Sequence, residues 1–315
     1  MNGSRFNSVA VVGAGLVGSA WSIIFSLAGL KVRVFDADAA VRGKVLERVR
    51  TGLADMEKAG LASAIDAALA RVTISATLAE AVGGADYIQE SAFETMPVKA
   101  AISREIGVAM RADAICGSSS SGIPASAFTA EVKNRNRFLI AHPVNPPHLV
   151  PIVELVPAPW TDSDVVPAVR ALMERVGQAP ISVNREVEGF ILNRLQGALL
   201  MEAFALYEEG YASAADIDTT ISQGLGLRWA FMGPFETIDL NAPGGVADYA
   251  RRFGPLYARI AASRTTPHGW SEALVEKVAA ERRAAVPADR LAERRDWRDR
   301  RLMALAAHLR KAKDD

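Results

Sequence analysis

The chain of 315 residues has one cysteine, no net charge and no long uninterrupted apolar run. The lone Cys116 excludes an internal disulfide and fits a reducing compartment. Because 36 basic residues balance 36 acidic ones, the composition argues against a nucleic-acid partner, which needs a basic excess in the binding domain. Glycines and charges interrupt every apolar stretch well short of the ~20 residues of a membrane span, and the N-terminus lacks the apolar core of a signal peptide. We therefore expect a cytoplasmic protein with no membrane partner.

A strand, a glycine turn, a helix and a second strand open the chain. Residues 8–12 are a β-branched run that ends at Gly13, residues 20–30 have a helical pattern, and residues 31–35 alternate like a strand. This order is a βαβ unit, which implies a parallel sheet with a right-handed crossover. Further strands are predicted at residues 71–75, 87–90, 114–117, 138–141 and 152–155, and two helices within residues 39–70.

Three glycines, Gly13, Gly15 and Gly18, join the first strand to its helix. In a dinucleotide-binding turn the first permits the tight turn, the second lets the backbone approach the pyrophosphate, and the third lets the helix pack close to the strand. Asp36 ends the second strand, where a carboxylate accepts hydrogen bonds from ribose hydroxyls and repels a 2′-phosphate. The pattern favours NAD over NADP. FAD, which can use the same turn, and a turn with no ligand are the alternatives.

The sequence changes character between residues 184 and 188, where the strand signals end. The segment from Gly189 to Glu209 is predicted to be one helix, apolar on most of its circumference, and such a helix is normally buried in a core or a subunit interface. We therefore expect an α/β fold with a Rossmann-type doubly wound sheet over residues 1–186. Residues 187–315 are expected to form an all-α domain that closes the site and builds a homodimer.

A histidine and a glutamate stand out among apolar neighbours. His142 lies where a predicted strand gives way to a proline-rich loop, and Glu154 lies within the apolar run of residues 151–156. A buried carboxylate needs a partner, because an unpaired buried charge is costly. Pairing with His142 would supply one, hold the imidazole in one tautomer and raise its basicity. From these residues alone, an acid–base pair and two separate structural side chains are equally good interpretations.

Serine and asparagine side chains are further candidates for binding a ligand. The serines of residues 118–121 follow a predicted strand at the edge where doubly wound sheets bind ligands, although loop and N-cap roles also suit serine. Asn193 lies near the start of the long apolar helix, where its amide either bonds the backbone or faces a cleft. No metal site is predicted.

Motifs along essentially the whole chain resemble those of the 3-hydroxyacyl-CoA dehydrogenase superfamily, and within it the L-gulonate 3-dehydrogenase (lambda-crystallin) branch. The matching segments are residues 12–18, 118–121, 141–147, 153–157, 189–196, 224–234, 286–289 and 295–298. The resemblance implies that His142 is the catalytic base, that Glu154 orients it, and that it accepts the proton of a secondary alcohol whose hydride goes to NAD. It further implies that Ser121 and Asn193 bind the reacting oxygen. It also implies NAD contacts from Leu16, Val17, Asp36, Glu94, Lys99 and Asn145.

Two classes of substrate fit this set of residues: small free 3-hydroxy acids and 3-hydroxyacyl-CoA thioesters. Residues 42–75 carry basic side chains offset by acidic ones, without the lysine-rich cluster that suits CoA phosphates. Arg228 stands in a segment that is uncharged in the acyl-CoA enzymes, and we expect its guanidinium to bind a substrate carboxylate. Pairing with Glu236 or Asp239 is the structural alternative.

The sequence therefore favours oxidation of a small L-3-hydroxy acid, with L-gulonate first. A short-chain 3-hydroxyacyl-CoA is the second substrate class. L-carnitine is a further alternative, because the segment around Arg228 also resembles carnitine dehydrogenases. A crystallin-like structural protein that binds NAD without turnover is the non-enzymatic alternative.

Overall fold

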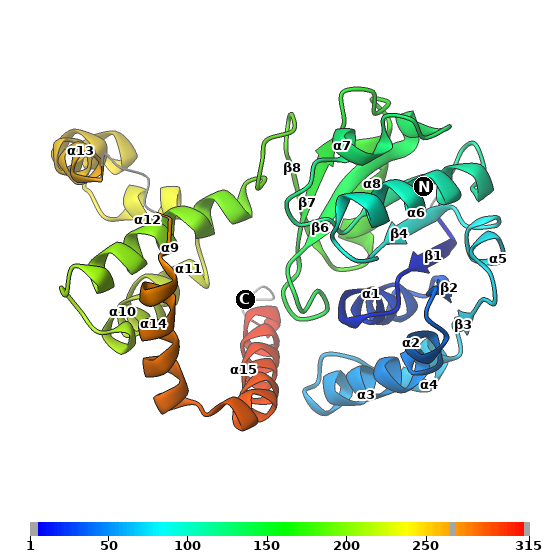
Figure 1. The fold of residues 1–315 in the computed structure, drawn as a ribbon, viewed down its shortest axis with the longest axis horizontal. Coiled ribbons are helices and arrows are strands. Elements are labelled where there is room, and N and C mark those ends of the chain that lie inside the picture. Colours follow the sequence, from blue (N-terminus) through cyan, green and yellow to red (C-terminus); the bar gives the residue numbers. More distant parts are fainter. Residues whose placement is uncertain (1–5, 265–268, 312–315) are drawn as a thin grey trace. The chain divides into compact units, whose positions relative to one another are not determined.

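The computed structural model describes residues 6–264 and 269–311. The chain divides into two compact units, Met1–Leu195 with Arg295–Asp315, and Gln196–Arg294 (Figure 1). Across the two described stretches, no helix combines the length and the apolar character that crossing a bilayer would require.

An eight-stranded sheet forms the centre of the first unit (Figure 1). Its strands are β1 (Ser8–Val12), β2 (Lys31–Phe35), β3 (Val72–Ile74), β4 (Tyr87–Glu90), β5 (Ile115–Ser118), β6 (Phe138–Pro143), β7 (Ile152–Pro157) and β8 (Ala179–Ser182). The spatial order is β3-β2-β1-β4-β5-β6-β7-β8, so the strand order reverses between β1 and β4. All neighbouring pairs are parallel except β6 and β7. The predicted doubly wound α/β fold is confirmed.

Helices cover both faces of this sheet. They are α1 (Leu16–Leu27), α2 (Ala39–Gly43), α3 (Val45–Lys58), α4 (Ile65–Leu69), α5 (Leu78–Val82), α6 (Met96–Ala109), α7 (Ala125–Thr129), the 3₁₀ turn η1 (Arg135–Arg137) and α8 (Val165–Arg175). In β1, Val9 and Val11 join the apolar cluster formed with α1 and α3, whereas Ala10 and Val12 join the cluster formed with α5 and α6. A parallel strand buried on both faces is therefore apolar at successive positions.

The sheet differs from the sequence prediction in two ways: one pair of strands is antiparallel, and one strand is additional. β7 runs antiparallel to β6, because the proline-rich segment 144–151 that joins them contains no crossover helix. β8 was not predicted. It contains Pro180, which weakens a strand signal but is tolerated here because β8 is an edge strand.

The described residues of the second unit form helices and loops and no strand. Its helices, with the two that join it to the first unit, are α9 (Leu192–Glu208), α10 (Ala214–Thr220), the π-helical η2 (Ile221–Leu225), α11 (Gly226–Trp229), α12 (Pro234–Leu240), α13 (Gly245–Ser263), α14 (Glu272–Ala285), the 3₁₀ turn η3 (Ala288–Arg290) and α15 (Leu291–Lys311). From Arg295 onward α15 belongs to the first unit.

The C-terminal helix thus differs from the expected division of the chain, which placed residues 187–315 in one helical domain. Met303 is buried in the apolar cluster of the first unit, and Leu302 packs against the same cluster. Arg310 Nη1 also donates to the carbonyl of Leu61 at 2.9 Å. An apolar stripe and a long-range hydrogen bond therefore hold the last helix on the first unit.

The long helix expected from Gly189 begins at Leu192, because Gly189 and Phe190 have φ angles of +73° and +48°. Left-handed residues cannot continue a right-handed helix. None of the side chains of α9 is buried within the chain, and Leu195 is 64% exposed. The apolar surface that the sequence predicts for this helix is present, but it does not form a domain core.

Candidate functional site

The glycine turn between β1 and α1 has the geometry that a dinucleotide requires. Gly13 has a φ of +98°, and a Cβ there would lie 2.5 Å from the backbone of Ser91. A Cβ on Gly18 would lie 1.8 Å from the carbonyl oxygen of Gly13, so the helix could not pack so closely on the turn. A Cβ on Gly15 would meet no atom within 4 Å. Gly15 therefore faces open space beside the N-terminus of α1, where backbone N–H groups favour a pyrophosphate.

Asp36 lies beside this turn, immediately after β2. Its Oδ2 accepts a hydrogen bond from the backbone N–H of Ala14 at 2.7 Å, and its Oδ1 accepts one from Asp38 at 2.9 Å. Each oxygen keeps a lone pair for a ribose hydroxyl. Leu16, exposed, and Val17, half-buried, form the first turn of α1. The glycine turn, Leu16, Val17 and Asp36, which are all predicted to contact NAD, therefore lie together and fit the group.

Glu94, predicted as an NAD contact, holds the serine loop that follows β5. Its carboxylate accepts hydrogen bonds from the backbone and hydroxyl of Ser121, both at 2.6 Å, and from the hydroxyl of Ser120 at 2.7 Å. The backbone of Gly122 donates to it at 3.0 Å. Burial raises the pKa of Glu94, but the hydrogen bonds from Ser121, Ser120 and Gly122 outweigh burial and leave the pKa below its usual value. The carboxylate is therefore ionised at neutral pH.

Lys99, also predicted as an NAD contact, is buried in an ion pair that sequence reasoning missed. Its Nζ lies 2.9 Å from both carboxylate oxygens of Glu90, and both side chains are 1% exposed. Lys99 also donates to the carbonyl of Ala92 at 3.2 Å, and Ser118 Oγ donates to Glu90 at 2.5 Å. The pair holds the start of the segment that carries Glu94. The only signal for it in the sequence is a glutamate at the end of an otherwise buried strand.

His142 and Glu154 form a buried pair. His142 Nδ1 lies 2.8 Å from Glu154 Oε2, with the two residues 6% and 1% exposed. They lie directly opposite each other in the antiparallel register of β6 and β7. Side chains at such positions project from the same face of the sheet close enough to touch. The strand pairing therefore brings together the imidazole and the carboxylate.

The other oxygen of Glu154 lies at the N-terminus of α9. Oε1 accepts hydrogen bonds from the backbone of Ile191 at 2.8 Å and of Leu192 at 3.0 Å. Burial raises the pKa of Glu154, but the hydrogen bonds with His142, Leu192 and Ile191 outweigh it, so the pKa lies below its usual value. Phe190 is fully buried, and the centroid of its ring lies 5.8 Å from the centroid of the imidazole. The backbone of Phe190 is left-handed, and it turns the chain toward Glu154. Residues strained in this way cluster at functional sites.

Asn193 connects this pair to the serine loop. Its Nδ2 donates to the carbonyl of Ser121 at 2.5 Å, which leaves its second amide hydrogen free for another acceptor. The beginning of α9 thus bonds both Glu154 and the loop of Ser121. Asn145, exposed, follows β6 in the loop after His142. The four predicted catalytic residues therefore belong to one unit: His142 pairs with Glu154, and Asn193 bonds the backbone of Ser121.

Arg228 belongs to the second unit, where it lies exposed in α11. Within residues 6–264 and 269–311 it forms no ion pair with Glu236 or Asp239. The carboxylate of Asp239 instead accepts the backbone N–H of Val246 at 2.7 Å. The structural alternative considered for Arg228 is therefore not realised among the described residues.

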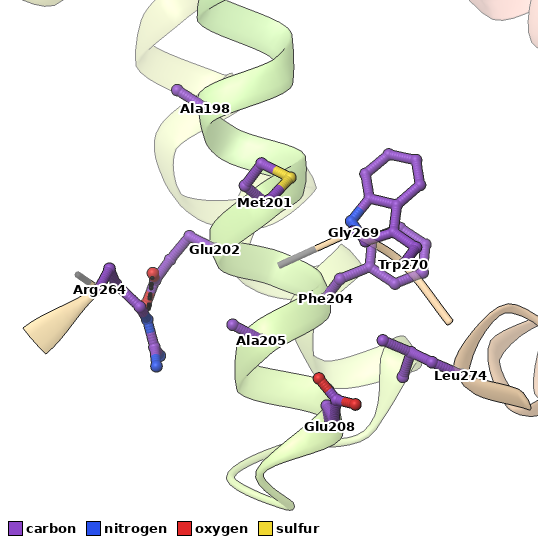
Figure 2. A pocket seen from close by; sticks show the side chains of 10 residues that line it. All are labelled: Ala198, Met201, Glu202, Phe204, Ala205, Glu208, Arg264, Gly269, Trp270 and Leu274. Carbon is purple, nitrogen blue, oxygen red and sulfur yellow. Dashed lines mark hydrogen bonds and ion pairs between the residues drawn. The ribbon is translucent and has the colours of Figure 1, made fainter. Parts of the chain in front are cut away.

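The second unit also contains a pocket beside α9 (Figure 2). It is lined by Ala198, Met201, Glu202, Phe204, Ala205, Glu208, Arg264, Gly269, Trp270 and Leu274. The rings of Phe204 and Trp270 stack with centroids 4.3 Å apart, and Arg264 pairs with Glu202 at 2.8 Å. These described lining residues provide apolar surface and an ion pair but no imidazole, hydroxyl or thiol. The pocket is therefore a weaker candidate for a catalytic centre than the His142–Glu154 pair.

Comparison with known proteins covers nearly the whole chain. The NAD-binding domain model of 3-hydroxyacyl-CoA dehydrogenase matches residues 8–187, and the C-terminal domain model matches residues 189–286. Lambda-crystallin of Oryctolagus cuniculus is 38% identical over 303 residues, which cover 95% of each chain. L-carnitine dehydrogenase of Pseudomonas aeruginosa is 35% identical over 311 residues, 98% of this chain and 96% of that one.

A solved structure supports the fold. The crystal structure of the NAD⁺-dependent dismutase 5-formyl-3-hydroxy-2-methylpyridine 4-carboxylic acid 5-dehydrogenase matches with a TM-score of 0.84. The match covers 97% of this chain and 99% of that one at 24% identity. The same combination of a doubly wound sheet and a helical C-terminal part is therefore present in a chain of similar length.

Proposed function

The chain belongs to the 3-hydroxyacyl-CoA dehydrogenase family and is an NAD-dependent dehydrogenase, and we propose that it oxidises the 3-hydroxyl of a small, free L-3-hydroxy acid. The observation that carries this proposal is the full-length similarity to an enzyme named for L-carnitine, which is itself a 3-hydroxy acid with a free carboxylate. L-Gulonate is our first candidate, because the chain resembles the L-gulonate 3-dehydrogenase branch over its whole length. L-Carnitine is the next.

His142 is the proposed base. Because Nδ1 faces the carboxylate of Glu154 at 2.8 Å, the tautomer with its hydrogen on Nδ1 is favoured and Nε2 is left to accept a proton. The substrate hydroxyl would give its proton to Nε2, and Glu154 would stabilise the resulting imidazolium. NAD, when bound, supplies the hydride acceptor.

Asn193 and Ser121 are proposed to contact the reacting oxygen in different ways. The second hydrogen of the Asn193 amide is available to donate to an oxygen on which negative charge develops. Ser121 gives its hydroxyl hydrogen to Glu94 at 2.6 Å. Because the single hydrogen of the substrate hydroxyl goes to His142, Ser121 would contact the reacting oxygen by turning its own hydrogen from Glu94 to that oxygen. Ser121 would then add a second donor to that of Asn193.

The region that would face CoA phosphates supports a free acid over a thioester. Several of its basic side chains already bond within the unit: Arg42 to the carbonyl of Asp36, Arg48 to that of Ala14, Arg71 to that of Ser26 and Lys58 to the carboxylate of Asp55. The carbonyls occupy arginine N–H groups that a phosphate would otherwise accept from, and Asp55 offsets the charge of Lys58. A short-chain 3-hydroxyacyl-CoA is therefore the second candidate.

Initial rates with NAD test the substrate class directly. We expect turnover with L-gulonate or L-carnitine at a higher kcat/KM than with L-3-hydroxybutyryl-CoA. Turnover of the thioester alone would overturn the free-acid proposal. NAD binding without reduction across the whole set of hydroxy acids would instead favour the structural, crystallin-like alternative.

Replacing Arg228 with methionine tests whether the substrate carboxylate is bound there. We expect kcat/KM for the free acid to fall about 100-fold, because a charge-assisted bidentate hydrogen bond is lost. The neutral amide of the same acid is expected to react equally with wild type and Arg228→Met. Arg259→Met, at another exposed position of the second unit, is the matched control. Equal losses on the acid and the amide would end the carboxylate assignment.

A homodimer is the proposed assembly. The second unit and the adjoining start of α9 expose many large apolar side chains, among them Leu195, Leu199, Tyr211, Leu227, Phe231, Phe235, Leu240, Tyr257 and Ile260. Monomeric proteins rarely leave so much apolar surface in contact with water. We expect sedimentation equilibrium at micromolar concentration to give twice the chain mass of 33.6 kDa. The mass of a single chain under those conditions would contradict the proposal.

A further inference from the structure

A chain of partly buried hydrogen bonds runs between the ends of β4 and β5. Its centre is the hydroxyl of Ser119, which lies 2.8 Å from Gln89 Nε2, 3.2 Å from Trp21 Nε1 and 2.9 Å from Ser91 Oγ. Gln89 and Trp21 are fully buried. Ser91 immediately follows β4 and is half-buried. Three side chains therefore surround one hydroxyl oxygen.

The chemistry of the partners sets the direction of these hydrogen bonds. The amide nitrogen of Gln89 must face the carbonyl of Ala141, 3.3 Å away, because a carbonyl only accepts. Gln89 Oε1 then accepts from the hydroxyl of Tyr87 at 2.7 Å. The amide of Gln89 and the indole of Trp21 thus both donate to Ser119, and they occupy both of its lone pairs. The single hydrogen of Ser119 can go only to Ser91.

Ser91 is therefore an acceptor from Ser119 and keeps its own hydroxyl hydrogen. Among residues 6–264 and 269–311, no group accepts that hydrogen from Ser91. Its backbone lies against the glycine turn, since a Cβ on Gly13 would be 2.5 Å from the carbonyl of Ser91. β1 and β4, which end immediately before Gly13 and Ser91, are the strands between which the sheet order reverses. Ligands of doubly wound sheets bind in the crevice at that point.

We propose that Ser91 is a further NAD-binding residue, which donates its hydroxyl hydrogen to an oxygen of the dinucleotide. Ser119, held by Trp21 and Gln89, is the positioning residue that directs this hydrogen, because it occupies the acceptor side of Ser91. The proposal concerns the cofactor alone and is independent of the substrate that the enzyme oxidises.

Calorimetric titration of the full chain with NAD, in the absence of substrate, tests the role of Ser91. We expect Ser91→Ala to raise the Kd for NAD ~10-fold, as the loss of one hydrogen bond to a polar ligand does. Ser91→Thr keeps the hydroxyl and is expected to bind within ~3-fold of wild type. Binding by Ser91→Ala within ~2-fold of wild type would overturn the proposal. If that variant does not fold, Ser91→Cys, whose thiol is a weak donor, is expected to bind as weakly.

A double-mutant cycle separates positioning from a merely structural effect. Ser119→Ala leaves the hydroxyl of Ser91 without its anchor and is expected to weaken NAD binding ~3-fold. When Ser119→Ala is added to Ser91→Ala, we expect no further change in the Kd for NAD. Two independent effects on the Kd would instead multiply. Ser8→Ala is the matched control, because the hydroxyl of Ser8 bonds to Gly84 and Asp86 at the opposite end of β1. An equal loss in Ser8→Ala would also overturn the proposal.

Discussion

Replacing His142 with glutamine is expected to lower kcat by ~10⁴-fold, the upper range for loss of a general base. The amide of glutamine cannot accept a proton at neutral pH, so no group at this position takes the hydrogen of the substrate hydroxyl. The variant should nevertheless fold, because the new amide can donate to Glu154 in place of the imidazole N–H and keep the buried carboxylate paired.

The affinity for NAD separates this effect from general damage to the site. We expect calorimetry to give a Kd for NAD within ~3-fold of wild type in His142→Gln, because the substitution removes the base but keeps the buried carboxylate paired. His308→Gln, at an exposed position of α15, is the matched control and should leave kcat unchanged. A kcat for His142→Gln within tenfold of wild type would exclude the imidazole as the base.

Local patterns were sufficient to predict the cofactor half of the fold. The β-branched run before Gly13, the alternation of residues 31–35 and Asp36 each depend only on neighbours in the sequence, and β1 and β2 begin and end where predicted. The glycine turn is predictable for the same reason, since its conformation is set by the missing Cβ atoms themselves.

The relation between His142 and Glu154 could not be derived in this way. It depends on the antiparallel register of β6 and β7, whereas the βαβ pattern suggested a parallel sheet. The same holds for the start of α9, where the apolar periodicity continues to Gly189 but the left-handed backbone of Phe190 delays the helix. The strand pairing places Glu154 opposite the imidazole, and the late start of α9 brings the N–H groups of Ile191 and Leu192 to the same carboxylate.

The buried polar groups around the cofactor crevice had even less local signal. Gln89 and Glu90 lie in a short strand among buried residues, and their partners come from α6 and from the loop after β5. Such partners become neighbours only when separate strands end at the same edge of the sheet. A polar residue in a strand that is otherwise buried is therefore the clue that sequence reasoning can use, because burial requires that it be paired.

The second large effect is expected from Glu154→Gln, which should lower kcat by about 10³-fold although the changed residue does not touch the substrate. In wild type one oxygen of Glu154 accepts from Ile191 and Leu192, and the other faces Nδ1 of His142. In the variant, the glutamine oxygen must take the position of the oxygen that faces Ile191 and Leu192, because an NH₂ group there would meet two N–H donors. Its NH₂ group then donates to Nδ1, so the imidazole carries its hydrogen on Nε2 and can no longer accept a proton from the substrate.

The pH dependence of stability provides an independent check of this variant. Because the pKa of Glu154 in the folded chain lies below the ordinary value of about 4.3, its ionised form stabilises the fold fully above that pH. The contribution is lost as the pH falls through the lower, folded value. Glutamine has no such titration, so the free energy of unfolding in urea should rise from pH 3 to 5 more steeply in wild type than in Glu154→Gln. Parallel curves for the two proteins would contradict a carboxylate held by His142 and the N-terminus of α9. A kcat that survives in Glu154→Gln would show instead that the carboxylate is structural and that the tautomer of His142 is set by another group.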